Sequence, residues 1–110
     1  MKSVLLVMTN MPDEASAENL ARILVDNRLA ACVNCLPGVQ SIYRWKGAVE
    51  QATETALLIK TIAGRYSELE AAIRQHHPYE VPEIIAIPPS TGWTPYLSWI
   101  VEETEKDIDV

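Results

Sequence analysis

Two long arms of β-strand character meet at a tight turn in the middle of the sequence, between residues 30 and 61. The turn falls at Arg44-Trp45-Lys46-Gly47, where Gly47 can adopt the positive φ that a short hairpin requires. The alternating positions are Val39, Ser41, Tyr43 and Trp45 before the turn, and Val49, Thr53, Thr55, Leu57 and Ile59 after it. Alternation with β-branched and aromatic residues on both sides of a turn predicts a β-hairpin.

The predicted arms are long for a chain of this size. An arm of about 14 residues spans roughly 46 Å, whereas a compact domain of this length has a diameter of roughly 34 Å. The tip is therefore expected to project and to present Ile42, Tyr43 and Trp45 to a partner surface. Because Pro37 cannot donate to a strand ladder, the first arm is expected at a sheet edge. The alternative is that Pro37-Gly38 divides this arm into two short strands.

The first 28 residues predict one strand and one helix. The apolar run 4–8 lacks alternation, which is typical of a central strand buried on both faces. After it, Asp13 is a plausible N-cap for a helix. One face of that helix carries Ala17, Leu20, Ala21, Leu24 and Arg28 at helical spacing, with Ile23 beside them.

The second half of the sequence predicts a helix, a strand and a final helix. Apolar residues at helical spacing begin at Tyr66, and Pro78 ends that helix because a residue before proline avoids helical geometry. Residues 84–87 form a short apolar strand, and Thr94 is expected to cap a last helix that has Pro95 at its first position. The order indicates one α+β domain over residues 1–110, with a split β-α-β sheet whose first and third strands are central.

Composition narrows the class of protein. Of the 110 residues, 48% are apolar, which is typical of a folded globular protein. There is no apolar run of about 20 residues and no signal-peptide pattern, so a cytoplasmic protein without a membrane partner is expected. The net charge is −6 and there is no basic stripe, which argues against nucleic acid as a partner.

The two cysteines, Cys32 and Cys35, form a C-x-x-C, but their flanking residues indicate a strand. Positions i and i+3 of a strand face opposite sides and lie about 10 Å apart. That distance excludes a disulfide, and two thiols supply only half of a zinc site. We interpret them as structural thiols.

The densest group of candidate ligands is 76–83, which holds both histidines and two carboxylates. Imidazole and carboxylate together suit Cu(II), Zn(II) or Ni(II). In this segment His76, His77 and Glu83 are the candidate metal ligands. The alternative is that the histidines only close a helix, where they interact well with its dipole and last carbonyls.

Other candidates carry weaker signals. Lys60 could hold an anion as a point charge, or could simply be a solvated strand end. The aromatic residues Tyr43, Trp45, Trp93, Tyr96 and Trp99 are more often packing residues than a ligand cage. No nucleophile with its base and no glycine-rich phosphate loop is recognisable, so an enzyme ranks third among the function classes.

Several ordered segments resemble the CutA family of divalent-cation tolerance proteins. They are Leu29-Ala30-Ala31-Cys32-Val33-Asn34, Ser41-Ile42-Tyr43-Arg44-Trp45-Lys46-Gly47, Lys60-Thr61, His77-Pro78-Tyr79-Glu80-Val81-Pro82-Glu83-Ile84 and Tyr96-Leu97-Ser98-Trp99. The resemblance implies a ferredoxin-like fold, a cytoplasmic homotrimer whose long arms pair across subunits, and a function in tolerance of copper and other divalent cations.

The resemblance also implies site residues. Copper, bound weakly as Cu2+, would use His76 and His77, with Glu83 nearby; Met8 stands where some members have a cysteine, and its thioether lacks the charge of a thiolate. A pocket between subunits would draw on Tyr43, Trp45, Lys60, Tyr79 and Glu83. The trimer is similar to that of the PII signalling proteins, so the alternative function is a small-molecule sensor or signalling adaptor that uses this pocket.

Overall fold

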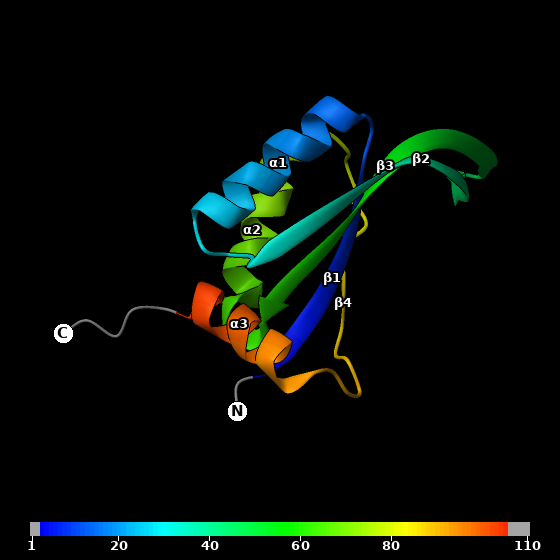
Figure 1. The fold of residues 1–110 in the computed structure, drawn as a ribbon. Coiled ribbons are helices and arrows are strands. Elements are labelled where there is room, and N and C mark those ends of the chain that lie inside the picture. The colour runs from blue at the N-terminus through cyan, green and yellow to red at the C-terminus, as the bar shows by residue number, and fades with distance from the viewer. Residues whose placement is uncertain (1–2, 106–110) are drawn as a thin grey trace.

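The computed structural model describes residues 3–105 as one antiparallel sheet with three helices (Figure 1). The elements are β1 (Val4–Met11), α1 (Glu14–Asp26), β2 (Cys32–Trp45), β3 (Ala48–Ile62), a 3-10 turn (Ala63–Arg65), α2 (Tyr66–His76), β4 (Ile85–Ile87) and α3 (Thr94–Thr104). The strand order is β2-β3-β1-β4. The α+β expectation is confirmed, with the first and third strands central and β2 at an edge.

The hairpin of β2 and β3 turns at two residues, Lys46 (φ 48°) and Gly47 (φ 84°). Positive φ at both positions matches the right-handed twist of the two strands. The alternative of two short strands is not adopted: β2 is continuous from Cys32 to Trp45, with one register shift between Leu36 and Val39. The chain measures 50 × 29 × 23 Å, and the hairpin curves away from the body as expected (Figure 1).

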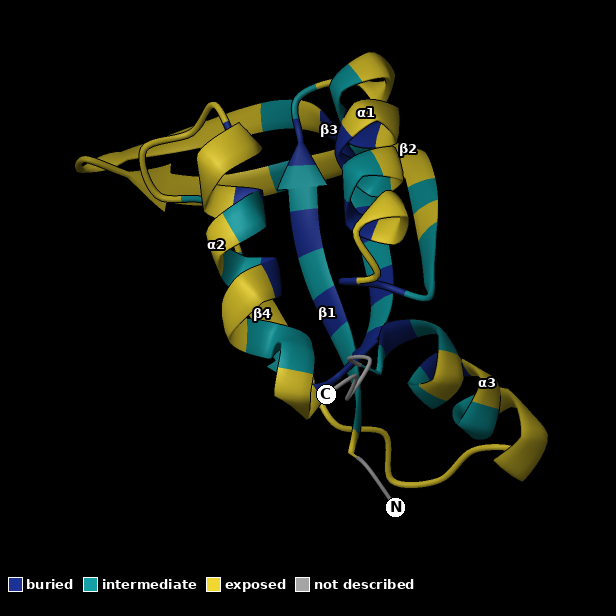
Figure 2. Ribbon diagram, turned by 90° about the vertical axis from the view of Figure 1, so that its left-hand side faces the viewer, coloured by how far each residue is buried: buried dark blue, intermediate teal, exposed yellow. Residues whose placement is uncertain are grey.

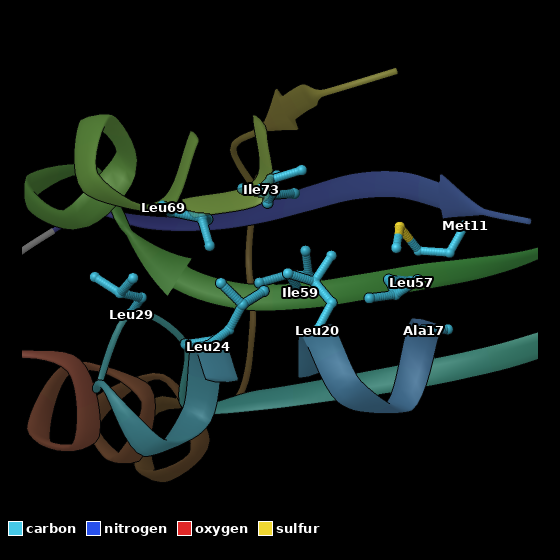
Figure 3. Close-up of a cluster of buried hydrophobic side chains, with 11 residues drawn as sticks. Met11, Ala17, Leu20, Leu24, Leu29, Leu57, Ile59, Leu69 and Ile73 are labelled. Atoms are coloured by element: carbon cyan, nitrogen blue, oxygen red, sulfur yellow. The ribbon is translucent and has the colours of Figure 1, made fainter. Parts of the chain in front are cut away.

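Helices α1 and α2 cover one face of the sheet and form the core with it (Figure 3). The predicted apolar faces of the helices are confirmed by the burial of Leu20 and Leu24 from α1 and of Leu69 and Ile73 from α2. The strands contribute Val7, Met11, Leu57 and Ile59 to the same cluster. Asp13 is the N-cap of α1, and its Oδ1 accepts a hydrogen bond from the Ser16 N–H at 2.8 Å.

Two predicted details of the elements are wrong. Strand β1 continues three residues beyond Met8, and within the single chain its buried positions alternate with half-buried ones instead of being covered on both faces. The reason is that α1 and α2 both lie on one side. Helix α3 begins at Thr94 with Trp93 at its N-cap and without a side-chain cap bond, although Pro95 does lie in its first turn.

Helix α3 lies at the end of the sheet that is far from the hairpin tip (Figure 1). Its last carbonyls accept hydrogen bonds from two arginines: Arg65 Nε donates to Thr104 O at 2.7 Å, and Arg28 Nη1 donates to Glu103 O at 3.3 Å. Burial is concentrated under α1 and α2, whereas the hairpin tip is exposed and α3 buries only Ile100 and Thr104 (Figure 2).

Candidate functional site: an acidic and aromatic pocket beside the hairpin

The two neighbouring histidines have different surroundings. Helix α2 ends at His76, whose side chain is exposed, while the backbone of His77 is already extended and its ring is buried, at 8% exposure. The ring Nε2 of His77 lies 2.6 Å from Asn10 O, and Nδ1 accepts a hydrogen bond from the Tyr79 N–H at 3.2 Å. Because a carbonyl only accepts, the ring hydrogen is on Nε2 and the lone pair on Nδ1 is used within the chain.

This arrangement separates the histidines as candidate metal ligands. A metal could reach His77 only by displacing the Tyr79 N–H from Nδ1, whereas the ring of His76 has no hydrogen bond or ion pair among residues 3–105. Within the same residues there is no group of three or more histidine, cysteine or acidic side chains placed to hold a metal ion. One subunit therefore offers at most a partial set of ligands.

The segment that follows His77 runs beside the outer half of the hairpin and encloses a pocket of about 840 Å³ with it. In Figure 2 this exposed connection follows α2 and lies against the ribbon of β2 and β3. The pocket is lined by Asn10, Gln40, Ser41, Ile42, Tyr43, Trp45, Glu54, Tyr79, Glu80, Val81, Pro82 and Glu83. Its volume is within the usual range for small-molecule sites, about 300–1,000 Å³.

The 79–83 segment forms one wall of the pocket, and two hydrogen bonds attach it to the sheet. The hydroxyl of Tyr79 donates to Glu54 Oε2 at 2.9 Å, and Asn10 Nδ2 donates to Glu83 Oε1 at 3.2 Å. Together with the His77 ring bonded to Asn10, they tie this segment to both β1 and β3. The pocket is thus assembled from three parts of the chain.

The charge of the pocket is negative. Glu54, Glu80 and Glu83 line it, and none of its described lining residues is a lysine or an arginine. Burial, followed by the hydrogen bond to Glu54 and the charge of that carboxylate, raises the pKa of Tyr79 to about 12. The Tyr79 phenol therefore stays a neutral donor near neutral pH. Such a surface favours a cation over an anion.

Four of the five residues expected in a pocket between subunits line this pocket of the single chain: Tyr43, Trp45, Tyr79 and Glu83. Lys60 lies elsewhere, because it is near the end of β3 that is far from the turn. Its ammonium contacts Asn34 Oδ1 and lies 3.8 Å from Cys32 Sγ. Lys60 therefore does not line this pocket of the single chain, and the pocket between subunits stays a prediction.

Among the lining residues that the sequence did not assign to a site, Asn10 and Glu54 make the hydrogen bonds to the 79–83 segment. Glu54 is 7% exposed although it is a carboxylate. Its signal in the sequence is its position directly before the buried run of β3, where an unpaired acid is unfavourable unless a partner is supplied. Asn10 carries no local signal, because its role depends on the segment that follows α2.

The cysteines behave as structural thiols. Cys35 packs against the core, whereas Cys32 lies near Lys60 on the other face of the sheet, as expected for strand positions i and i+3. Both thiols are free. Burial, with a smaller effect of Glu18, raises the pKa of the Cys35 thiol, which disfavours a reactive thiolate.

The sheet order β2-β3-β1-β4, the helices on one face and the long projecting hairpin define a ferredoxin-like α+β protein. A family model described as CutA1 divalent ion tolerance protein matches residues 5–103. The chain belongs to this family.

Individual relatives agree. The divalent-cation tolerance protein CutA of Thermus thermophilus is 44% identical over 99 residues, which cover 90% of this chain and 96% of the relative. A solved structure of divalent cation tolerance protein (Cut A1) from the same organism gives a TM-score of 0.90 at 44% identity, covering 92% of this chain and 98% of that one.

The compartment differs from the expectation in at least one similar protein. The structure of CutA from Archaeoglobus fulgidus, described as a periplasmic divalent cation tolerance protein, gives a TM-score of 0.89 at 35% identity and covers 93% of this chain and 99% of that chain. Within residues 3–105, the helices are all too short or too polar to span a membrane. A cytoplasmic location stays a prediction.

Proposed function

We propose that this protein serves divalent-cation tolerance as a cytoplasmic homotrimer that binds divalent cations, Cu2+ among them, and that it is not an enzyme. The observation that carries the proposal is the acidic pocket: three carboxylates and no lysine or arginine among its described lining residues, next to the helix end that bears His76. Family membership supports the same function. The cation is the cargo of the protein in this proposal.

The proposed ligands are His76 and Glu83, and the contribution of His77 is indirect. His76 presents an exposed imidazole at the end of α2, and imidazole with carboxylate suits Cu2+. His77 holds Asn10 and Tyr79 in place through its two ring nitrogens. Because one subunit supplies so few ligands, we expect weak binding that water or a neighbouring subunit completes.

Trimer formation is supported by apolar side chains that the single chain leaves exposed. Val49 at the hairpin tip is 65% exposed, and Ile85 and Ile87 of β4 are 51% and 45% exposed. The sheet face away from α1 and α2 and the projecting hairpin would be covered by two further copies in a closed ring. Light scattering at micromolar concentration tests this, and a mass of 12.3 kDa would contradict it.

Calorimetry with Cu2+ at about pH 7 tests the ligands. We expect His76→Ala to weaken binding at least about tenfold, since even outer-shell partners of a metal are worth that much. Glu83→Gln should also weaken it, while its amide oxygen can still accept from Asn10. Glu50→Gln, which removes a charge from the same hairpin outside the pocket, is the matched control. Equal Cu2+ affinities in wild type and His76→Ala would show that His76 is not a ligand. As a control, each variant must keep the oligomer mass of the wild type.

The second candidate function is a small-molecule sensor or signalling adaptor that uses the pocket, with metal tolerance as an indirect effect. The observation in its favour is the pocket volume of about 840 Å³, which is far larger than a metal ion requires. Thermal shift measurements with divalent metals and with small organic ligands separate the two functions. Stabilisation by an organic ligand and by no metal would favour the sensor.

A further inference from the structure

We propose that the pocket binds a small organic cation with N–H donors, an amine or a guanidine, anchored on Glu54 and held against the rings of Tyr43 and Trp45. This inference rests on the second function above, the pocket as a small-molecule site, and assigns the chemical class of its ligand. Copper binding through His76 is independent of it.

Glu54 is the anchor because it is a largely buried residue whose second carboxylate oxygen stays accessible. The residue is 7% exposed and lines the pocket. Oε2 accepts the hydrogen bond from the Tyr79 hydroxyl, and Oε1 is not among the buried polar atoms that lack a partner. A carboxylate on a largely buried residue favours a charged donor, and charge-assisted hydrogen bonds are about twice as strong as neutral ones. An ammonium or guanidinium supplies both the charge and the donor.

The other two carboxylates are exposed, unlike Glu54. Glu83 Oε1 accepts from Asn10 Nδ2, and Glu80 Oε2 pairs with Lys46 Nζ at 3.6 Å, where both side chains are well exposed. Both carboxylates contribute to the negative potential, but solvent screens them more than it screens Glu54. The ligand head group is therefore expected at the Glu54 end of the pocket.

Aromatic walls add a second element of recognition. Tyr43, Trp45 and Tyr79 line the same pocket, and the face of an aromatic ring attracts a cation within about 6 Å. The chain shows this pairing at the pocket's rim, where Lys46 Nζ lies 5.5 Å from the centroid of the Trp45 ring. Lys46 thus has the two kinds of partner, a ring and a carboxylate, that we infer for the ligand.

Three probes of similar shape test the charge requirement: butylguanidinium, the neutral butylurea and the anionic butyrate. Titration calorimetry at low salt should show butylguanidinium binding at least about tenfold more tightly than butylurea, and no binding of butyrate. Equal affinities for butylguanidinium and butylurea, or no binding of butylguanidinium at millimolar concentration, would overturn the proposal. Binding of butyrate alone would overturn it while leaving the pocket as a small-molecule site.

Variants locate the site. Glu54→Gln keeps an acceptor for Tyr79 but removes the charge, and should weaken butylguanidinium binding at least about tenfold; Glu50→Gln should leave it unchanged. Trp45→Leu should weaken it about threefold to tenfold through loss of the ring face. Equal losses in Glu54→Gln and Glu50→Gln would show only a diffuse charge effect and overturn the assignment.

A gain-of-affinity variant keeps the test decisive if Glu54→Gln is unfolded. Lys46→Asn removes the cation at the rim, and asparagine tolerates the positive φ of this turn position. Because a like charge is removed, butylguanidinium should bind about twofold to fivefold more tightly. Unchanged or weaker binding in a folded Lys46→Asn protein would contradict the inference. A Cu2+ titration of His76→Ala, run in parallel, reports on the metal function separately.

Discussion

The two halves of the long hairpin use similar residues for different purposes. In the inner half, Leu57 and Ile59 are fully buried under α1 and α2 and stabilise the subunit. In the outer half, Ile42 and Val49 are 70% and 65% exposed. Both halves have the same alternation, so the difference comes from where the helices end. The helices do not reach the outer half, where only the 79–83 segment lies beside the hairpin and leaves Ile42 and Val49 exposed.

The largest effect is expected from placing a charge in the outer half. Val49→Glu should reduce the trimer to a 12.3 kDa subunit at micromolar concentration, because burying an unpaired carboxylate in an interface is costly. Analytical ultracentrifugation measures the mass, and circular dichroism checks that the subunit stays folded. Val49→Thr, which is similar in shape and neutral, is the control and should affect the mass less. An unchanged trimer mass in Val49→Glu would refute a role of the tip in association.

The next effect concerns the inner half. Leu57→Ala should lower the free energy of unfolding by about 2–5 kcal/mol, through lost burial and the cavity that remains. Urea denaturation of both proteins at one fixed concentration measures it, because oligomer stability depends on concentration. A loss of unfolding free energy below about 1 kcal/mol would mean either that neighbouring side chains fill the cavity or that the inner half of the hairpin is not at the centre of the core.

A smaller effect on stability is expected from the hydrogen bond that connects the hairpin to the 79–83 segment. Tyr79→Phe removes the hydrogen bond to Glu54 and should cost about 1 kcal/mol near pH 8. The folded pKa of Tyr79 is about 12, against a usual value of 10, so the contribution is complete below about pH 10 and is lost as pH rises through 12. Partial exposure reduces its size.

Urea denaturation of wild type and Tyr79→Phe across pH 8–12 isolates this contribution, since other tyrosines titrate in both proteins. The difference between the two proteins should shrink above pH 10. If the stability difference between the two proteins stays constant to pH 12, the pKa of Tyr79 is not raised in the folded state.

The smallest effect on stability is expected at His76. Because the side chain is exposed, His76→Ala should change the free energy of unfolding by less than about 0.5 kcal/mol. His77→Ala is the comparison: it removes two ring hydrogen bonds from a buried position and should cost about 1–3 kcal/mol. Chemical denaturation measures both. Equal losses of stability in His76→Ala and His77→Ala would mean that the two histidines contribute equally to the fold, contrary to their different burial and hydrogen bonding.

Local chemistry made most of the fold predictable. The Lys46-Gly47 turn, the alternation on both arms, the apolar faces of α1 and α2 and the Asp13 cap are properties of short segments, and each is found where it was expected. The two wrong details have a shared cause. Burial on both faces of β1 and the start of α3 depend on what packs against these segments, and a residue run does not contain that information.

The sequence by itself also determined the family, because the matching residues lie in ordered segments whose resemblance is specific. The pocket that it predicts between subunits stays a prediction. Only the tertiary structure decided which histidine faces the solvent and which carboxylate of the pocket is buried. His77 is oriented by the carbonyl of Asn10, 67 residues away, and Glu54 meets the Tyr79 hydroxyl across 25 residues. Hydrogen-bond partners over such separations are set by how strands and helices pack, and neighbouring residues with the same side chain then receive different roles.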